Sequence, residues 1–224
     1  MAELVVLGAG LSGTLMAYEL LPKLRKGEDR VTVARIELPE GPYDIARSTV
    51  FMPASASLPK VEATKRYGAE VVLTGKDFGE AYKAAVEHAE SEGAFFVHPY
   101  NHPHIIAGQG TVGCEVVEQA GEVGSIVVPV GGGGLISGVA ASIRALAPNA
   151  RIVGVQAAGA ASFPPSLAQG KPITLERMST IADGIAANSP GDLTLAHVQR
   201  LVVEIVSVNV DAIAEALVYC VERM

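Results

Sequence analysis

Four consecutive glycines, Gly131 to Gly134, constrain this chain more than any other feature. They follow the β-branched stretch GSIVVPV (124–130) and precede the amphipathic stretch LISGVAASIRALAP (135–148), so they lie at a predicted strand-to-helix junction. Glycine has no Cβ, which lets several backbone N–H groups approach one oxyanion. A helix that begins directly after the loop adds unpaired N–H groups and the positive end of its dipole. We interpret the run as a phosphate-binding loop, and the alternative is a tight turn without chemistry.

Strand-like and helix-like segments alternate along most of the chain. Further predicted strands cover 49–53, 69–75, 94–99, 150–158 and 204–208, and further predicted helices cover 57–68, 77–93, 192–202 and 209–224. Asp77 and Asp192 are the expected N-caps of two of these helices, and Gly93 lies just past the end of one. Residues 104–121 read as a loop and then a helix, whereas 159–190 show no regular period. The alternation predicts an α/β fold with a twisted, mostly parallel sheet and helices on both faces.

The first 38 residues predict a Rossmann-like β-α-β start. Its elements are a strand at 3–10, a helix at 11–27 and a second strand at 30–38. A G-x-G-x-x-G motif at Gly8, Gly10 and Gly13 follows the first strand and opens the helix, which makes FAD or NAD a candidate cofactor here. The stretch resembles the FAD-binding start of flavoproteins of the sulfide:quinone oxidoreductase kind. The alternative is a β-α-β unit that only completes a sheet.

Four later segments resemble the threonine dehydratase and serine racemase family, which are fold-type-II pyridoxal-phosphate enzymes. The segments are FMPASASLPKVEATKRYGAEVVLTG (51–75), FVHPYNHPHIIAGQGTVGCEVVEQ (96–119), SIVVPVGGGGLISGVAASIRALAPNARIVGVQ (125–156) and TIADGIA (180–186). The resemblance implies that the cofactor phosphate is bound by the backbone amides of Gly131, Gly132, Gly133, Gly134 and Leu135. It also implies that Tyr100 and Gly184 lie near the cofactor ring.

The same resemblance implies a substrate and a division of the chain. The family's lyases remove water and then ammonia from a hydroxy amino acid, so the expected substrate is a small amino acid such as L-threonine or L-serine. Residues 1–97 would form an N-terminal α/β part, which joins the β-α-β start to a segment like the family's small domain. Residues 98–224 would form a part like the large domain, with the glycine loop.

The family's cofactor-binding lysine has no counterpart in this sequence. No lysine lies in the family's Ser-Phe-Lys-x-Arg-Gly type of motif, and Lys60 reads as a solvated helix residue. Because that lysine binds the cofactor covalently and moves the α-proton, we expect weak or no lyase activity and assign no catalytic residue. Two alternatives are an FAD- or NAD-binding oxidoreductase and a non-catalytic composite fold.

The two resemblances meet near residues 38–50, so the chain reads as chimeric. A natural fusion, a gene-assembly artefact and a deliberately assembled chain would all have this pattern.

No metal site is predicted. Some relatives bind a divalent cation beside carboxylates at positions where this chain has Gln156, Ala160 and Ser162. The stretch HPYNHPH (98–104) holds three histidines, but its prolines interrupt helical spacing and no carboxylate or cysteine is interleaved. We expect a structural loop there.

The composition limits which kinds of partner the chain is expected to bind. A net charge of −7 and a pI of about 5.3 argue against nucleic-acid binding, which needs Lys and Arg to neutralise phosphates. No long apolar run predicts a membrane span, and Cys114 and Cys220 are expected to be buried thiols in a reducing cytoplasm. The last predicted helix carries Ile213, Leu217 and Val221 on one face. We expect packing within the chain to cover them, with a homo-oligomer as the alternative.

Overall fold

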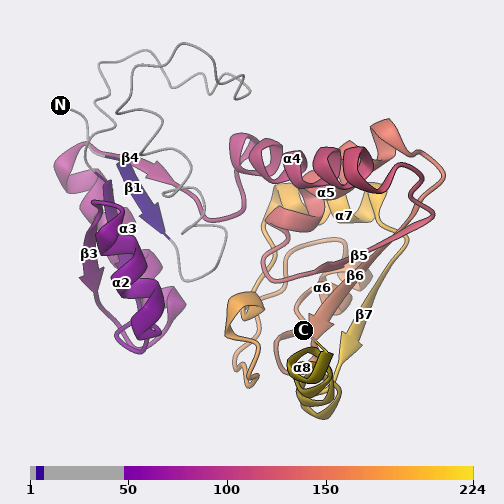
Figure 1. The fold of residues 1–224 in the computed structure, drawn as a ribbon. Helices are drawn as coiled ribbons and strands as arrows, with labels where there is room; N and C mark the ends of the chain where they lie inside the picture. The colour runs from indigo at the N-terminus through magenta and orange to yellow at the C-terminus, as the bar shows by residue number, and fades with distance from the viewer. Residues whose placement is uncertain (1–3, 8–47, 224) are drawn as a thin grey trace. The chain divides into compact units, whose positions relative to one another are not determined.

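The chain divides into two compact units in a computed structural model that describes residues 4–7 and 48–223 (Figure 1). The units are Met1–Pro99 and Tyr100–Met224. The predicted parts, 1–97 and 98–224, divide the chain two residues earlier. The predicted helix at 11–27 and strand at 30–38 lie outside the described residues, as do Gly8, Gly10 and Gly13.

The first unit contains a parallel sheet with strand order β3-β2-β1-β4. Its elements are β1 (Leu4–Leu7), β2 (Ser48–Met52), α2 (Leu58–Arg66), β3 (Glu70–Leu73), α3 (Phe78–Glu92) and β4 (Phe95–Val97). Alternate residues of β2 face opposite sides of the sheet. Val50 and Met52 pack with Val61 of α2, whereas Phe51 packs with Ala85 of α3. Helices therefore cover both faces of this sheet, as the sequence predicts.

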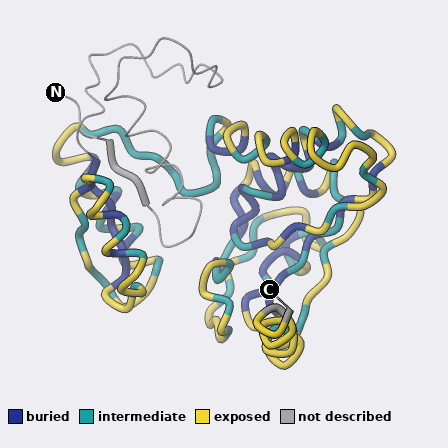
Figure 2. The backbone as a smooth tube through the Cα atoms, viewed as in Figure 1, coloured by how far each residue is buried: buried dark blue, intermediate teal, exposed yellow. Residues whose placement is uncertain are grey.

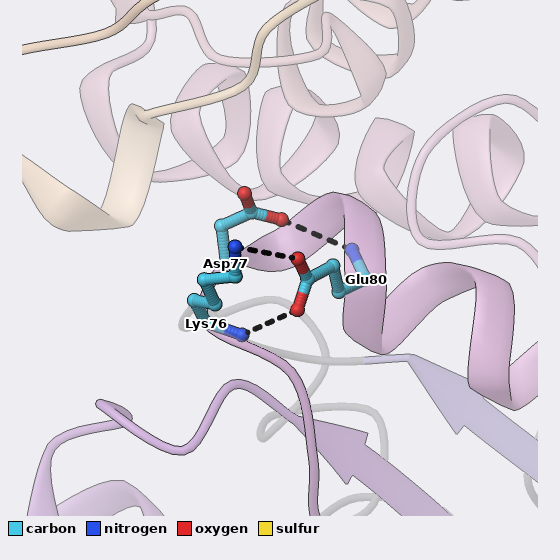
Figure 3. Close-up of polar contacts among 3 residues, drawn as sticks. All are labelled: Lys76, Asp77 and Glu80. Carbon is cyan, nitrogen blue, oxygen red and sulfur yellow. Dashed lines mark hydrogen bonds and ion pairs between the residues drawn. The ribbon is translucent and has the colours of Figure 1, made fainter.

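The predicted caps of α3 are confirmed. Asp77 is the N-cap, and its Oδ1 accepts a hydrogen bond of 3.0 Å from the backbone N–H of Glu80 (Figure 3). The Glu80 carboxylate in turn accepts from the backbone N–H of Lys76 at 2.9 Å. Gly93 ends the helix in the left-handed conformation, with φ +63°, which glycine adopts at little cost.

The second unit contains a parallel sheet with strand order β5-β6-β7. Its elements are α4 (Pro103–Ala120), β5 (Ser125–Pro129), α5 (Gly134–Leu146), β6 (Arg151–Ala157), η1 (Ala158–Ala160), α6 (Phe163–Gln169), η2 (Asp183–Ile185), α7 (Asp192–Leu201), β7 (Glu204–Val208) and α8 (Val210–Arg223). The predicted α/β fold with parallel sheets is thus confirmed.

The two faces of the second sheet differ in burial. Val128 and Ile152 join the core with Ile136 of α5 and Leu195 of α7. On the opposite face Val127 is 65% exposed. Parallel sheets normally bury both faces, whereas here the face that carries Val127 is exposed.

Helices α4 and α5 cross closely at glycines. A Cβ at Gly138 would lie 2.3 Å from the Ile106 carbonyl oxygen and 2.5 Å from the Gly110 nitrogen. Backbone atoms cannot move aside as side chains do, so only glycine fits this crossing. The contact holds α4 against the helix that begins at the glycine loop.

Three local predictions need correction. Helix α4 begins at Pro103, so residue 104 is already helical and His102 is its N-cap. The stretch 159–190 is not wholly irregular, because it contains α6. The N-cap of α7 is Gly191 instead of Asp192. Each of these segments is rich in Pro, Gly or Ser, and the first turn of α7 is also held from a distance, because the Leu193 N–H donates to Asn101 Oδ1 at 3.0 Å.

Two burial predictions are also wrong. The Cys114 thiol is exposed and free, whereas the side chain of Cys220 lies outside the described residues. Helix α8 is exposed along most of its length, with Leu217 at 56% and Val221 at 84% (Figure 2). Of the predicted apolar face, Ile213 is half-buried, and packing within the described chain leaves Leu217 and Val221 uncovered. Homo-oligomerisation stays a prediction. None of the described helices combines the length and apolar character that crossing a bilayer requires.

Candidate functional site

The glycine run joins β5 to α5, as predicted. Gly133 is the N-cap of α5 and has φ +95° and ψ +1°, whereas Gly134 starts the right-handed helix. A left-handed residue next to a right-handed one turns successive N–H groups toward a common point. Gly132, Gly133 and Gly134 are all buried, so these polar groups are shielded from bulk water.

Three successive carbonyl groups of the loop are hydrogen-bonded to the protein interior. The Gly131 oxygen accepts from Gln156 Nε2 at 3.5 Å. The Gly132 oxygen accepts from Thr194 Oγ1 at 2.7 Å. The Gly133 oxygen accepts from the backbone N–H of Ser137 at 3.0 Å.

These bonds set the direction of the loop's N–H groups. In a trans peptide the C=O and the following N–H point in opposite directions, and the described chain has no cis peptide. The N–H groups of Gly132, Gly133 and Gly134 therefore point away from the groups that hold the preceding carbonyls. No acceptor among the described residues pairs with an amide from Gly131 to Leu135. Buried N–H groups without partners are rare, so this loop is suited to bind an anion.

Neighbouring groups explain why these positions are glycine. A Cβ at Gly132 would lie 2.5 Å from the Tyr100 ring. A Cβ at Gly133 would lie 2.6 Å from the Phe163 ring and 2.8 Å from Thr194 Cβ. The loop is therefore packed on both sides by large groups, and side chains within it would displace them.

The predicted ring-contacting residues lie near the loop. The Tyr100 ring packs against Gly132, and its hydroxyl donates a hydrogen bond of 3.1 Å to the Ser189 carbonyl. Gly184 lies in η2, and the backbone of the next residue, Ile185, packs against Gly131. The structure thus brings Tyr100 and Gly184 to the same region as Gly131–Leu135. Their contact with a cofactor stays a prediction.

Three residues that pack against the glycine loop were not predicted from the sequence. Thr194, Gln156 and Phe163 are fully buried around it. The role of Thr194 has no clear local signal, because the sequence predicts Asp192 as the N-cap of α7, whereas Gly191 is the N-cap in the structure. The position of Phe163 beneath Gly133 has no local signal.

The site beside Gln156 holds no cluster of metal ligands. The Gln156 amide donates toward Gly131 and Ala160 and accepts from the Phe163 N–H at 3.0 Å. Among the described residues, no group of three or more His, Cys, Asp or Glu side chains gathers around a point. The His102 ring has a capping role instead, because its Nδ1 accepts from the His104 N–H at 3.2 Å.

A comparison of the chain with models of protein families gives a result that agrees with its fold and its glycine loop. The model of the family "Pyridoxal-phosphate dependent enzyme" matches residues 43–224. The chain belongs to this family. The predicted resemblance to threonine dehydratases and serine racemases is confirmed by individual relatives.

One such relative is the L-threonine ammonia-lyase of Geobacter sulfurreducens. It is 51% identical over 176 residues, which cover 79% of this chain and 44% of that protein. The processed form of threonine deaminase isoform 2 from Solanum lycopersicum has a TM-score of 0.78 at 34% identity, covering 96% of this chain and 56% of that one. Maize serine racemase has a TM-score of 0.80 at 33% identity, covering 97% and 59%. The chain spans about half the length of these relatives.

The flavin interpretation receives no support from these comparisons, since the family model that matches the chain is that of pyridoxal-phosphate dependent enzymes. A chimeric origin of the chain also receives no support from the comparisons. Because Gly8, Gly10 and Gly13 lie outside the described residues, FAD or NAD binding there stays a prediction.

Proposed function

We propose that this chain binds pyridoxal phosphate by its phosphate group, through the backbone amides of Gly131, Gly132, Gly133, Gly134 and Leu135. The observation that carries the proposal is the set of loop N–H groups that lack acceptors among the described residues. Because they lie at the start of α5, the helix dipole adds a positive potential at the same place. The buried backbone fits a phosphate group and needs no cationic side chain.

Tyr100 and Gly184 would lie beside the cofactor ring. Pyridoxal phosphate, when bound, supplies an electron sink for negative charge at the α-carbon of an amino acid. The names of the relatives, L-threonine ammonia-lyase and threonine deaminase, support L-threonine as substrate and deamination as the parent reaction. L-serine is proposed on the family resemblance alone. The packed Tyr100 ring would limit the entry of water on one side of the loop.

We expect weak or absent lyase activity because of where the lysines of the chain lie in the sequence. Those in the described chain are Lys60, Lys65, Lys76, Lys83 and Lys171, and none lies in the family's lysine motif. Because no lysine of the sequence lies in that motif, we assign no group to move the α-proton. A cytoplasmic location suits the exposed, free thiol of Cys114.

A spectroscopic titration tests the proposal. The purified chain is titrated with pyridoxal phosphate and, in parallel, with pyridoxal, which has the same ring without the phosphate. Each sample is then reduced with borohydride and weighed by intact mass spectrometry, and ammonia release from L-threonine is assayed. We expect saturable binding of pyridoxal phosphate, much weaker binding of pyridoxal, no stoichiometric adduct and little ammonia.

The possible results test phosphate recognition and the expected inactivity separately. Equal binding of the two compounds would contradict phosphate recognition by the loop. A stoichiometric adduct on one lysine, together with ammonia release, would contradict the expected inactivity, and peptide mapping would identify that lysine. A yellow flavin that copurifies with the chain would instead favour the oxidoreductase alternative.

A further inference from the structure

The hydroxyl of Thr194 joins α7 to the glycine loop across 62 residues of sequence. Thr194 is fully buried, and its Oγ1 donates to the Gly132 carbonyl at 2.7 Å. The same oxygen accepts from the backbone N–H of Gly191 at 2.9 Å. One side chain thus caps α7 and holds the loop.

Because a hydroxyl both donates and accepts, the direction of each hydrogen bond of Thr194 can be assigned. A threonine hydroxyl has one proton to donate and lone pairs to accept with. The Gly191 N–H occupies a lone pair, so the proton is free for a carbonyl. Two carbonyls compete for it, at 2.7 Å for Gly132 and 3.1 Å for Gly191. The shorter distance favours Gly132.

Packing keeps Thr194 in this position. Its Cβ lies against Gly133, at a site where a loop side chain would meet it. Its own backbone carbonyl accepts from Ser137 Oγ of α5 at 3.4 Å. The threonine is therefore held between α5 and α7, and its hydroxyl has little freedom to turn away from the loop.

We infer that Thr194 is the positioning residue of the phosphate loop. By holding the Gly132 carbonyl inward, it points the N–H of Gly133 outward, because the two groups share one peptide plane. Thr194 would act through the Gly132 carbonyl and is not among the groups proposed to contact the phosphate. It determines how strongly the chain prefers a phosphate-bearing ligand over the same ligand without phosphate. The inference rests on the proposed function, since the phosphate is the group that the amides meet.

The test compares three variants of the full chain. T194V keeps the shape of the side chain and removes the hydroxyl, whereas T194S keeps the hydroxyl. T111V is the matched control, because Thr111 is exposed and also donates to a carbonyl, that of Gly108 at 2.9 Å. Affinities for pyridoxal phosphate and pyridoxal are measured for each variant, after circular dichroism has shown that it is folded.

We expect T194V to bind pyridoxal phosphate about tenfold more weakly, as the loss of one buried hydrogen bond implies. Its affinity for pyridoxal should not change, and T194S and T111V should resemble the wild type. A purely structural role of Thr194 would weaken the binding of both ligands together and would overturn the inference. Unchanged binding of pyridoxal phosphate by T194V would also overturn it.

A measurement on the wild type needs no variant. Inorganic phosphate should shift the amide proton resonances of Gly132, Gly133 and Gly134 more than those elsewhere in the chain. A largest shift outside the loop would overturn the inference. Failure of the proposed function is distinguishable, because in that case the wild type would not bind pyridoxal phosphate in the first titration.

Discussion

Residue 133 must be glycine for two separate reasons, its backbone conformation and the lack of space for a Cβ. Its φ of +95° lies in the left-handed region, which costs a residue with a Cβ about 1–2 kcal/mol. In addition, a Cβ there would collide with Phe163 and Thr194. Conformation and packing therefore require glycine for different reasons at the same place.

The substitution G133A tests both demands. We expect it to lower the free energy of unfolding by at least about 2 kcal/mol, since backbone strain and overpacking add. G108A is the control, because Gly108 is an exposed helical residue with no heavy atom near its added Cβ. It should stabilise the chain by up to about 1 kcal/mol. Urea unfolding measures both, and equal effects would contradict the prediction.

His102 makes the start of α4 sensitive to pH. Its Nδ1 can accept the His104 N–H only while the ring is neutral. Burial, and then the charge of His104, hold the pKa of His102 below its ordinary value of 6.5. The folded chain therefore binds this proton less readily than the unfolded chain does.

This pKa predicts the sign of a pH effect. The contribution of His102 to stability is fully present above pH 6.5 and is lost as the pH falls through the lowered pKa. In H102N the amide oxygen accepts at any pH, and Asn is a good N-cap. Unfolding free energies measured from pH 5 to 8 should fall less steeply toward acid for H102N than for the wild type. Parallel curves would rule out this role.

Within the sheet of the second unit, the strand β5 has one buried and one exposed face. Val128 is 4% exposed and packs in the core, whereas the adjacent Val127 is 65% exposed. The period of two in a strand separates these neighbours onto opposite faces. Two residues of the same type in one strand thus have different energetic roles.

Threonine substitution measures that difference directly, because threonine has the shape of valine. V128T should lower the free energy of unfolding by about 1–3 kcal/mol, the cost of burying an unpaired hydroxyl. V127T should change it by less than about 0.5 kcal/mol. Both are measured by urea unfolding. A large loss for V127T would show that another surface covers this face in solution.

For the molecule as a whole, the candidate site belongs to one of the two compact units. The loop, its supporting residues and Tyr100 all lie within Tyr100–Met224. A ligand bound to these residues stabilises the folded state by mass action. The stabilisation acts first on the unit that provides the contacts.

Pyridoxal phosphate at a hundred times its dissociation constant should therefore add about 2.7 kcal/mol to the stability of the second unit. Hydrogen exchange followed by mass spectrometry locates the effect. Exchange should slow in peptides from β5, α5 and α7, and not in those from β2 and β3. Equal slowing in all of these peptides would contradict a site confined to the second unit.

The sequence by itself determined most of the order of strands and helices and the place of the glycine loop between β5 and α5. The caps Asp77 and Gly93, the alternation of strands and helices, and four glycines at a strand-to-helix junction are all signals that act within a few residues. Such signals work because a helix end or a turn is satisfied by neighbouring atoms. Four sequence segments separately carried the resemblance to the threonine dehydratase family, which the relatives confirm.

Only the tertiary structure decided what lies behind the loop and which faces are covered. Thr194 reaches the Gly132 carbonyl from 62 residues away, and Phe163 fills the space beneath Gly133. Exposure of Val127 and of α8 likewise depends on which helices pack where. Local periodicity cannot reveal these contacts, because burial and long-range hydrogen bonds arise only when distant segments meet.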